Sequence, residues 1–244
     1  MVLPLLPLIS TTPFAFTGHK KEYFAEMWGT YILVFIGPAS VVVASLTPGL
    51  SSLEALVSVA LVFGCTVASV ITFLGKHSGA HINPAITVAN AAAGIFKMEL
   101  VAPYVAFQLA GGLLAGLSLD VVFKGLASTA YLGSTKLAVG VTPVEGIALE
   151  IAGTFALAIS ALSASSFVRS PVKQGAIVGA TLFALIMLIG PLTGASFNPA
   201  RSLGPAVFSG YLSGQFVYWL GPLAGAGLAG LIFGVLRRYH ASRR

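Results

Sequence analysis

Charged side chains are scarce in this sequence of 244 residues, because only 8% of them are Asp, Glu, Lys or Arg while 57% are hydrophobic. The mean hydropathy is +0.95. A water-soluble globule of this length would need more polar surface to cover its core. The composition therefore excludes an ordinary soluble domain and predicts a protein that is solvated by lipid.

Cysteine is almost absent, since Cys65 is the only one, and an internal disulfide is thereby excluded. We interpret Cys65 as a small packing residue within a membrane span. The histidines at positions 19, 77, 81 and 240 have no partners at metal-ligand spacing, so we expect no metal and no other cofactor. No nucleophile, base and orienting group can be assembled from the polar residues, which argues against an enzyme.

Six apolar stretches are each about 20 residues long, which is enough to cross the hydrocarbon core of a bilayer. They are Phe24–Leu46, Leu53–Leu74, Met98–Phe123, Pro143–Ser163, Lys173–Ile189 and Gln215–Leu236. This pattern predicts an all-α membrane protein that crosses the bilayer repeatedly. The apolar, proline-containing start of the chain is a poor signal peptide, and we expect it to lie on the membrane surface.

Positive charges are distributed asymmetrically around these stretches. Ten of the thirteen Lys and Arg residues fall in segments that alternating crossings place on one side of the membrane. They are Lys20, Lys21, Lys76, Lys97, Arg169, Lys173, Arg237, Arg238, Arg243 and Arg244. The positive-inside rule therefore predicts a multi-pass protein of the cell membrane with both termini in the cytoplasm, and the net charge of +6 gives no reason to expect a nucleic-acid partner.

The two halves of the chain resemble each other at two places. Ala25–Thr30 resembles Leu149–Thr154, and Ser78–Ala85 resembles Thr193–Ala200. Each half holds an odd number of spans, so the two copies must lie in opposite orientations, with the functional site near the midplane where they meet. We expect an N-terminal extension (1–22), a first repeat (23–123), an extracellular connecting loop (124–142), a second repeat (143–238) and a basic tail (239–244).

An Asn-Pro-Ala triplet occurs in each half, before an apolar segment that is too short to cross a bilayer: Ala85–Gly94 and Ala200–Phe208. Such segments are expected to be re-entrant half-helices. The simplest interpretation of the triplet is a helix start, with Asn as the N-cap and Pro at the first helical position. Capping would use the side-chain oxygens of Asn83 and Asn198 and leave their amides as free donors at the membrane centre.

These features resemble the aquaporin (major intrinsic protein) family, and archaeal aquaporins most of all. The resemblance covers about residues 22 to 238 and is most specific at Ser78–His81, at both triplets, at Asn198–Ser202 and at Trp219–Pro222. It implies a bundle of six transmembrane helices around two re-entrant half-helices, assembled as a homotetramer with one pore in each subunit.

The resemblance also implies roles for individual residues. The pore centre would be formed by Asn83, Pro84, Ala85, Asn198, Pro199 and Ala200. The selectivity filter would be formed by Phe63, Ile186, Ala195 and Arg201. Ordinary core packing is the alternative for Phe63 and Ile186, and snorkelling to the outer face is the alternative for Arg201.

Three further residues would support the re-entrant loops. Glu26 and Glu150 occupy matching places in the repeat and would accept backbone N–H groups, although either could instead lie at the membrane interface. His81 would pack in the first loop and line the cytoplasmic side of the pore.

The predicted function is a passive channel for water that excludes protons and ions. Ile186 stands where strict water channels of the family usually carry His, so a facilitator of glycerol or other small neutral solutes is the alternative. Ser202, Ala206, Tyr218 and Trp219 resemble the water channels instead. A coupled secondary transporter, which also uses inverted repeats and broken helices, is the alternative from another class, and a closed adhesive relative is a third.

Overall fold

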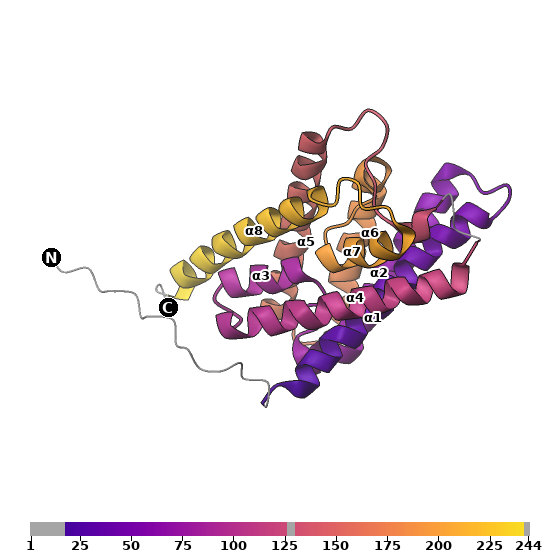
Figure 1. Cartoon of the computed structure of the whole chain (residues 1–244). Helices are drawn as coiled ribbons and strands as arrows, with labels where there is room; N and C mark the ends of the chain where they lie inside the picture. The colour runs from indigo at the N-terminus through magenta and orange to yellow at the C-terminus, as the bar shows by residue number, and fades with distance from the viewer. Residues whose placement is uncertain (1–17, 126–129, 242–244) are drawn as a thin grey trace.

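The computed structural model describes residues 18–125 and 130–241 and contains six long helices and two short ones (Figure 1). The α-helices are α1 (Lys20–Leu46), α2 (Ser52–Ser78), α3 (Pro84–Ala92), α4 (Val101–Phe123), α5 (Pro143–Phe167), α6 (Pro171–Thr193), α7 (Pro199–Ser209) and α8 (Val217–Ala241). A short 3-10 helix, η1 (Met98–Leu100), precedes α4, and a second, η2 (Tyr131–Gly133), follows it. The predicted N-terminal extension lies mostly outside the described residues.

The six long helices are long and apolar enough to cross a membrane, as predicted. Their apolar stretches were placed correctly, but several helices are longer than those stretches. For example, α5 extends beyond Ser163 to Phe167, and α6 extends beyond Ile189 to Thr193. Hydropathy marks only the part of a helix that is surrounded by lipid, whereas the hydrogen-bonded backbone continues into the polar flanks.

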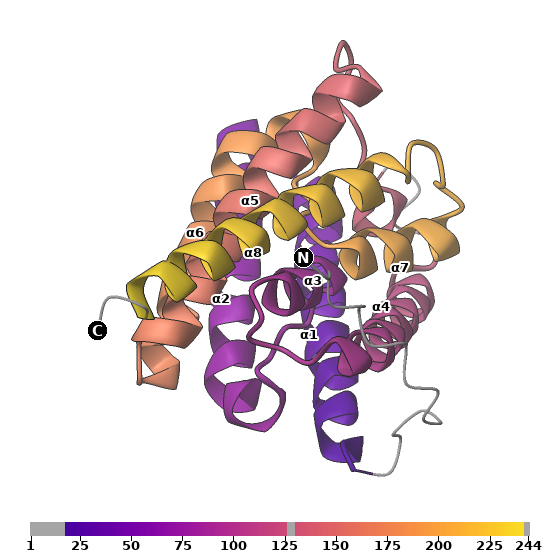
Figure 2. The same cartoon turned by 90° about the vertical axis from the view of Figure 1, so that its left-hand side faces the viewer.

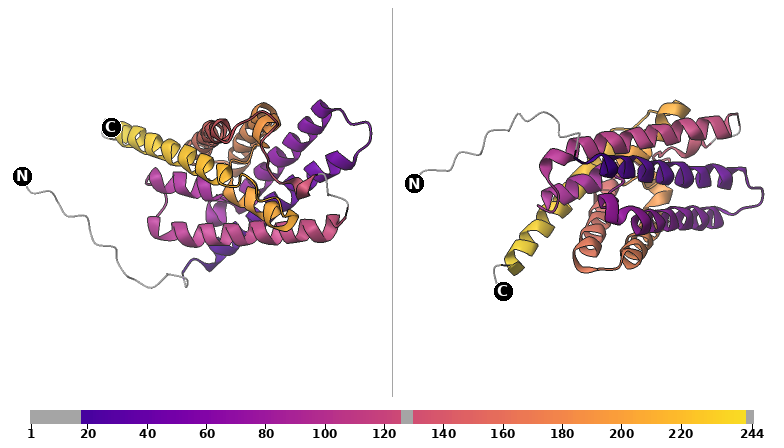
Figure 3. Two further views of the ribbon diagram at one scale, coloured as in Figure 1. Left: turned by 45° about the horizontal axis from the view of Figure 1, so that its top comes forward. Right: turned by 90° about the horizontal axis from the view of Figure 1, so that it is seen from below.

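The half-helices α3 and α7 join the two repeats by packing across them. The helix α3 of the first repeat packs against α8 of the second, and α7 of the second repeat packs against α4 of the first (Figure 2). The long helices α2 and α6 also pack against each other across the repeats. Seen from below, α4, α1 and α2 lie side by side (Figure 3). The half-helix of each repeat is therefore covered by a long helix of the other repeat.

Glycines allow the half-helices to approach the long helices closely. A Cβ atom on Gly112 in α4 would lie 2.6 Å from the carbonyl oxygen of Ala200 in α7. Gly230 of α8 faces the backbone of Ala89 in α3 in the same way. Gly112 and Gly230 are thus required because the backbones of two helices are in contact at these positions.

We expect Gly112→Ala to lower the thermal unfolding temperature of the detergent-solubilised protein. The added methyl group overpacks a backbone contact, which costs about 1–3 kcal/mol. Circular dichroism would follow the unfolding. Gly227→Ala in α8 is the matched control, because no atom lies within 4 Å of its Cβ position. Equal stability of the two variants would contradict a tight α4–α7 contact.

Cys65 does not pack in the interior as expected. Its side chain is exposed on α2, beside Gly64, which is the residue that contacts the backbone of Gly179 in α6. Gly64 makes the close contact between α2 and α6, whereas the side chain of the next residue, Cys65, points away from that contact.

Candidate functional site

The two triplets begin α3 and α7 as N-caps, as the sequence predicts. The Asn83 side-chain oxygen accepts a hydrogen bond from the backbone N–H of Ala85 at 2.8 Å. The Asn198 oxygen accepts from the N–H groups of Ala200 at 3.0 Å and Arg201 at 3.3 Å. Pro follows Asn in each case, where its missing N–H has no intrahelical partner to lose.

The amide groups of the two asparagines are not wholly free, in contrast to the expectation from sequence. Asn83 Nδ2 donates to the carbonyl oxygen of Phe197 at 2.7 Å, and Asn198 Nδ2 donates to that of Ile82 at 2.9 Å. Each acceptor belongs to the residue just before the opposite triplet. An amide nitrogen carries two N–H groups, so one holds the repeats together and one is left for a ligand.

Glu26 is completely buried and binds the loop before the first triplet. One carboxylate oxygen accepts from Ser78 Oγ at 2.6 Å and from the N–H of His81 at 2.9 Å. The other accepts from the N–H of Ile82 at 2.6 Å and from Gln108 Nε2 at 2.7 Å. All of these partners are donors, so the side chain acts purely as an acceptor.

Glu150 repeats this arrangement in the second half. Its oxygens accept from Thr193 Oγ1 at 2.7 Å and from the N–H groups of Ser196 at 3.0 Å and Phe197 at 2.8 Å. It is also completely buried. Both glutamates are therefore held inside the protein by donors from the loops.

The backbone of the two loops that Glu26 and Glu150 bind is strained. Ala80 and Ile82 in the first loop and Ala195 and Phe197 in the second have φ between 45° and 52°. Residues with a Cβ atom rarely adopt this left-handed conformation, which costs about 1–3 kcal/mol each. The carboxylate hydrogen bonds offset this cost at equivalent places in both repeats.

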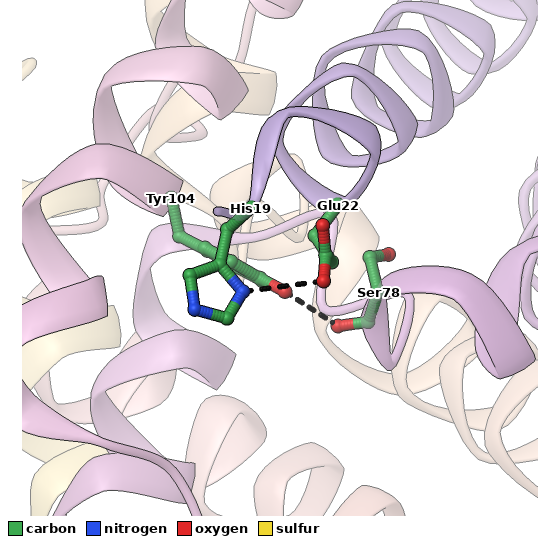
Figure 4. A network of polar contacts seen from close by, with 4 residues as sticks. All are labelled: His19, Glu22, Ser78 and Tyr104. Atoms are coloured by element: carbon green, nitrogen blue, oxygen red, sulfur yellow. Dashed lines mark hydrogen bonds and ion pairs between the residues drawn. The ribbon is translucent and has the colours of Figure 1, made fainter. Parts of the chain in front are cut away.

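His81 lies among aromatic rings at the start of the first loop. Its Nδ1 is 3.2 Å from Thr87 Oγ1, and its ring centroid lies 4.9 Å from that of Phe96 and 5.4 Å from that of Tyr104. The Tyr104 hydroxyl donates to the Ser78 carbonyl at 3.0 Å, near the His19–Glu22 ion pair (Figure 4). His81 is thus fixed in the loop.

Three adjoining cavities run past these residues. The central cavity leaves only about 50 Å³ for the centres of water molecules and is lined by Asn83, Asn198 and mostly aliphatic side chains. The outer cavity, of about 330 Å³, shares Phe63, Ala195 and Arg201 with it. The inner cavity, of about 540 Å³, shares His81 with it. The smallest of the three volumes is therefore the one that both asparagines line.

The four residues expected to form the filter lie together. Phe63, Ile186, Ala195 and Arg201 all line the outer cavity, from α2, α6, the second loop and α7. The Arg201 guanidinium carbon lies 4.8 Å from the centroid of the Phe63 ring. Phe63 and Ile186 are buried, but in the wall of this cavity, so they are not merely core residues.

Arg201 is buried and is held by a carbonyl. Its NH1 group donates to the carbonyl oxygen of Gly133 at 2.9 Å, whereas its Nε has no partner. Among the described residues no carboxylate forms an ion pair with it. The guanidinium is thus buried beside the cavity without a direct ion pair, within electrostatic reach of the Glu150 carboxylate, and does not snorkel to the surface.

Sequence reasoning missed several residues that position this site. Gly133 and Thr135 belong to the connecting loop, and Thr135 Oγ1 lies 2.8 Å from Ser202 Oγ. No sequence pattern marks them. By contrast, Tyr218 donates to the Thr193 carbonyl as Tyr104 does to Ser78, at separations of 25 and 26 residues. A comparison of the repeats could have found that pair.

Residues 14–233 match the sequence profile of the family described as "Major intrinsic protein". The chain belongs to this family. Aquaporin TIP2-1 of Arabidopsis thaliana is 35% identical over 223 residues, covering 88% of this chain and 86% of the relative. Aquaporin NIP1-2 of Oryza sativa subsp. japonica is 36% identical over 218 residues, covering 87% of this chain and 70% of the relative. Both are plant major intrinsic proteins, so the expected resemblance to archaeal aquaporins above all is not borne out.

A solved structure has the same fold. The X-ray structure of the aquaglyceroporin from Plasmodium falciparum superposes with a TM-score of 0.77 at 21% sequence identity, covering 89% of this chain and 95% of the other. The match confirms the predicted helical architecture.

Proposed function

We propose that the chain forms a passive transmembrane channel, and not an enzyme, which conducts water and small neutral solutes and excludes protons and ions. The observation that carries this proposal is the narrow central cavity at which both half-helices begin. Its volume of about 50 Å³ holds only a few water molecules. The names of the plant aquaporin relatives support the same function.

Stopped-flow light scattering on proteoliposomes under an osmotic gradient tests the proposal. Liposomes that contain the protein should shrink faster than empty liposomes of the same lipid. Equal rates for protein-containing and empty liposomes would overturn it.

The two asparagines would orient water at the centre of the channel. Each has one amide N–H left after the cross-repeat hydrogen bond, and both side chains line the central cavity. A water oxygen that accepts from both amides cannot accept from its neighbours in the file. The chain of hydrogen bonds along which protons would move is thereby interrupted.

Positive electrostatic potential would exclude cations at two levels. The N-termini of α3 and α7 bring the positive ends of two helix dipoles to the central cavity. The Arg201 guanidinium adds a full charge where the central and outer cavities meet. Exclusion by half-helix dipoles and an arginine is the established principle of aquaporin-type pores, and the residues of this chain suit it.

The outer cavity would select between solutes, with Phe63, Ile186, Ala195 and Arg201 as the filter. Arg201 supplies donors on one side, and the side chains of Phe63 and Ile186 supply apolar walls. A solute with hydroxyl groups and an apolar carbon backbone fits such walls, which favours glycerol conduction as a second activity.

We expect Ile186→His to raise the ratio of water to glycerol permeability several-fold. The imidazole replaces an apolar wall with a polar group, so the carbon backbone of glycerol loses an apolar contact while water gains a hydrogen-bond partner. Stopped-flow measurements with each solute would give the ratio. Leu188→His is the control, because Leu188 lies on the same helix and its side chain is 72% exposed. An unchanged ratio in Ile186→His would remove Ile186 from the filter.

Coupled transport is less compatible with the site. A transporter needs a carboxylate near the midplane that can bind and release a proton or sodium ion. Both oxygens of Glu26 and of Glu150 are already occupied by donors from the loops. Their proposed role is to hold the loops, with His81 lining the inner side of the channel.

We further propose that the protein assembles as a homotetramer in the cell membrane with both termini in the cytoplasm. The distribution of Lys and Arg supports this orientation, although the TIP-type names of some relatives leave an intracellular membrane as the alternative. The organisation into two repeats, a connecting loop and short terminal segments supports a pore within each subunit. Light scattering coupled to size-exclusion chromatography would test the tetramer.

A further inference from the structure

A groove separate from the central cavity is lined by the last turns of α5 and α8. These two helices pack against each other (Figure 2). Its volume is about 680 Å³, and α5 contributes Ile159, Ser163 and Phe167, which recur every four residues on one face. The apolar part of α8 contributes Phe233 and Leu236. From Ile159 to Phe167 the groove follows about 12 Å of helix, at 1.5 Å per residue, which is most of one leaflet of the hydrocarbon core.

The end of this groove is positively charged. Arg237 and His240 line it from the last turns of α8. His240 Nδ1 lies 2.8 Å from the Leu236 carbonyl, so its other ring nitrogen is available. No described carboxylate forms an ion pair with Arg237, since the one ion pair among the described residues joins His19 and Glu22. The groove thus combines a long apolar wall with an unneutralised cation at its end.

We propose that this groove binds one anionic phospholipid of the bilayer. An acyl chain would lie along Ile159 and Phe233, and the phosphate would accept hydrogen bonds from Arg237. His240 donates to the Leu236 carbonyl through Nδ1, so it would donate to the phosphate from its other nitrogen only as the imidazolium. A guanidinium pairs well with phosphate oxygens, and basic residues at the end of a transmembrane helix attract acidic lipids. A free phosphate ion would use the cations but not the apolar wall.

The proposed lipid site adjoins the channel. Phe167 and Arg237 line the inner cavity as well as the groove. A phosphate in the groove would attract the Arg237 side chain away from the inner cavity and widen it. Anionic lipid is therefore expected to increase water permeability, an effect that rests on the proposed channel function.

Native mass spectrometry of the full chain tests the binding directly. Titration with palmitoyl-oleoyl phosphatidylglycerol should give a saturable one-lipid adduct per subunit that phosphatidylcholine and inorganic phosphate do not give. Arg237→Gln should weaken this adduct roughly fivefold, as expected for one basic contact. Arg238→Gln is the matched control, because Arg238 does not line the groove, and its affinity should stay near wild type.

A second variant separates groove binding from general attraction to charge. Ser163→Phe keeps every cation but fills the apolar part of the groove, so it should also weaken the adduct. Three results would each overturn the proposal. They are an equal loss of lipid affinity in Arg237→Gln and Arg238→Gln, equal binding of phosphatidylcholine and phosphatidylglycerol, and undiminished lipid binding by Ser163→Phe.

The coupling is measured separately by stopped-flow scattering. Wild-type protein should conduct water faster in vesicles of phosphatidylcholine with phosphatidylglycerol than in phosphatidylcholine alone, after subtraction of matched empty vesicles. Arg237→Gln should lose this difference. An adduct without any change in permeability would refute the coupling, whereas failure of water conduction itself would refute the proposed function and leave the mass-spectrometric result standing.

Discussion

Replacing Glu150 with glutamine is expected to lower water permeability about tenfold or more, because a buried donor left without its acceptor costs ~1–3 kcal/mol. The amide of glutamine would place its own N–H groups against the N–H of Phe197 or the donors at Ser196 and Thr193. Phe197 is also the residue whose carbonyl accepts from Asn83. A displacement of this loop therefore reaches the first triplet as well as the second.

Glu145→Gln provides the matched control for this substitution. Glu145 lies on the same helix but is part of an exposed capping box with Thr142. Glutamine serves nearly as well in a capping box, so permeability and stability should stay close to wild type. Stopped-flow scattering and thermal unfolding would be measured on both variants. If Glu150→Gln conducted water normally, the loops would be shown to hold their shape without the carboxylate.

Arg201→Val is expected to raise proton or cation conductance about tenfold or more. A unit charge ~4 Å from a passing cation contributes about 4 kcal/mol of repulsion at an effective dielectric constant of about 20. Valine removes that charge and leaves the Gly133 carbonyl, which now accepts from Arg201, free to attract a cation. The measurement is the decay of a pH gradient, reported by an internal dye, in proteoliposomes with potassium and valinomycin.

Lys136→Val serves as the control for a lost positive charge. Lys136 belongs to the connecting loop, where its ammonium group lies 5.3 Å from the Tyr131 ring centroid. It does not line the outer or central cavity. Its removal should leave the pH gradient intact. A silent Arg201→Val variant would assign cation exclusion to the two helix N-termini alone.

Much of the fold could be predicted from the sequence because a bilayer leaves few options. Backbone in lipid must satisfy its own hydrogen bonds, so an apolar stretch of about 20 residues becomes a helix and a shorter one must return. The duplicated octets around Asn83 and Asn198 identified the two repeats, and the odd number of spans in each predicted their inverted orientation. The burial of Glu26 and Glu150 could be anticipated from the repeat, since the two glutamates occupy equivalent places in its two copies.

The remaining features depend on contacts between segments that no local pattern reports. The second partner of each asparagine amide is a carbonyl of the opposite loop, and a sequence does not indicate which carbonyls will face each other. Gly133 was missed because its part in the site is played by its backbone oxygen. Cys65 was misplaced because hydropathy does not distinguish the exposed side of a span from the side packed inside the chain.

The exchange of half-helices between the repeats constrains how the protein can be made. While α3 emerges from the ribosome, its packing partner α8 has not yet been synthesised, because α4, α5, α6 and α7 lie between them in the chain. Until α8 is made, the first half must hold α3 and its strained loop in the membrane without this neighbour. Backbone groups of the loop that lack hydrogen-bond partners in lipid are costly during that time. Packing of α3 is consequently a late event in biogenesis, completed only after translation has passed Gly230, which contacts Ala89.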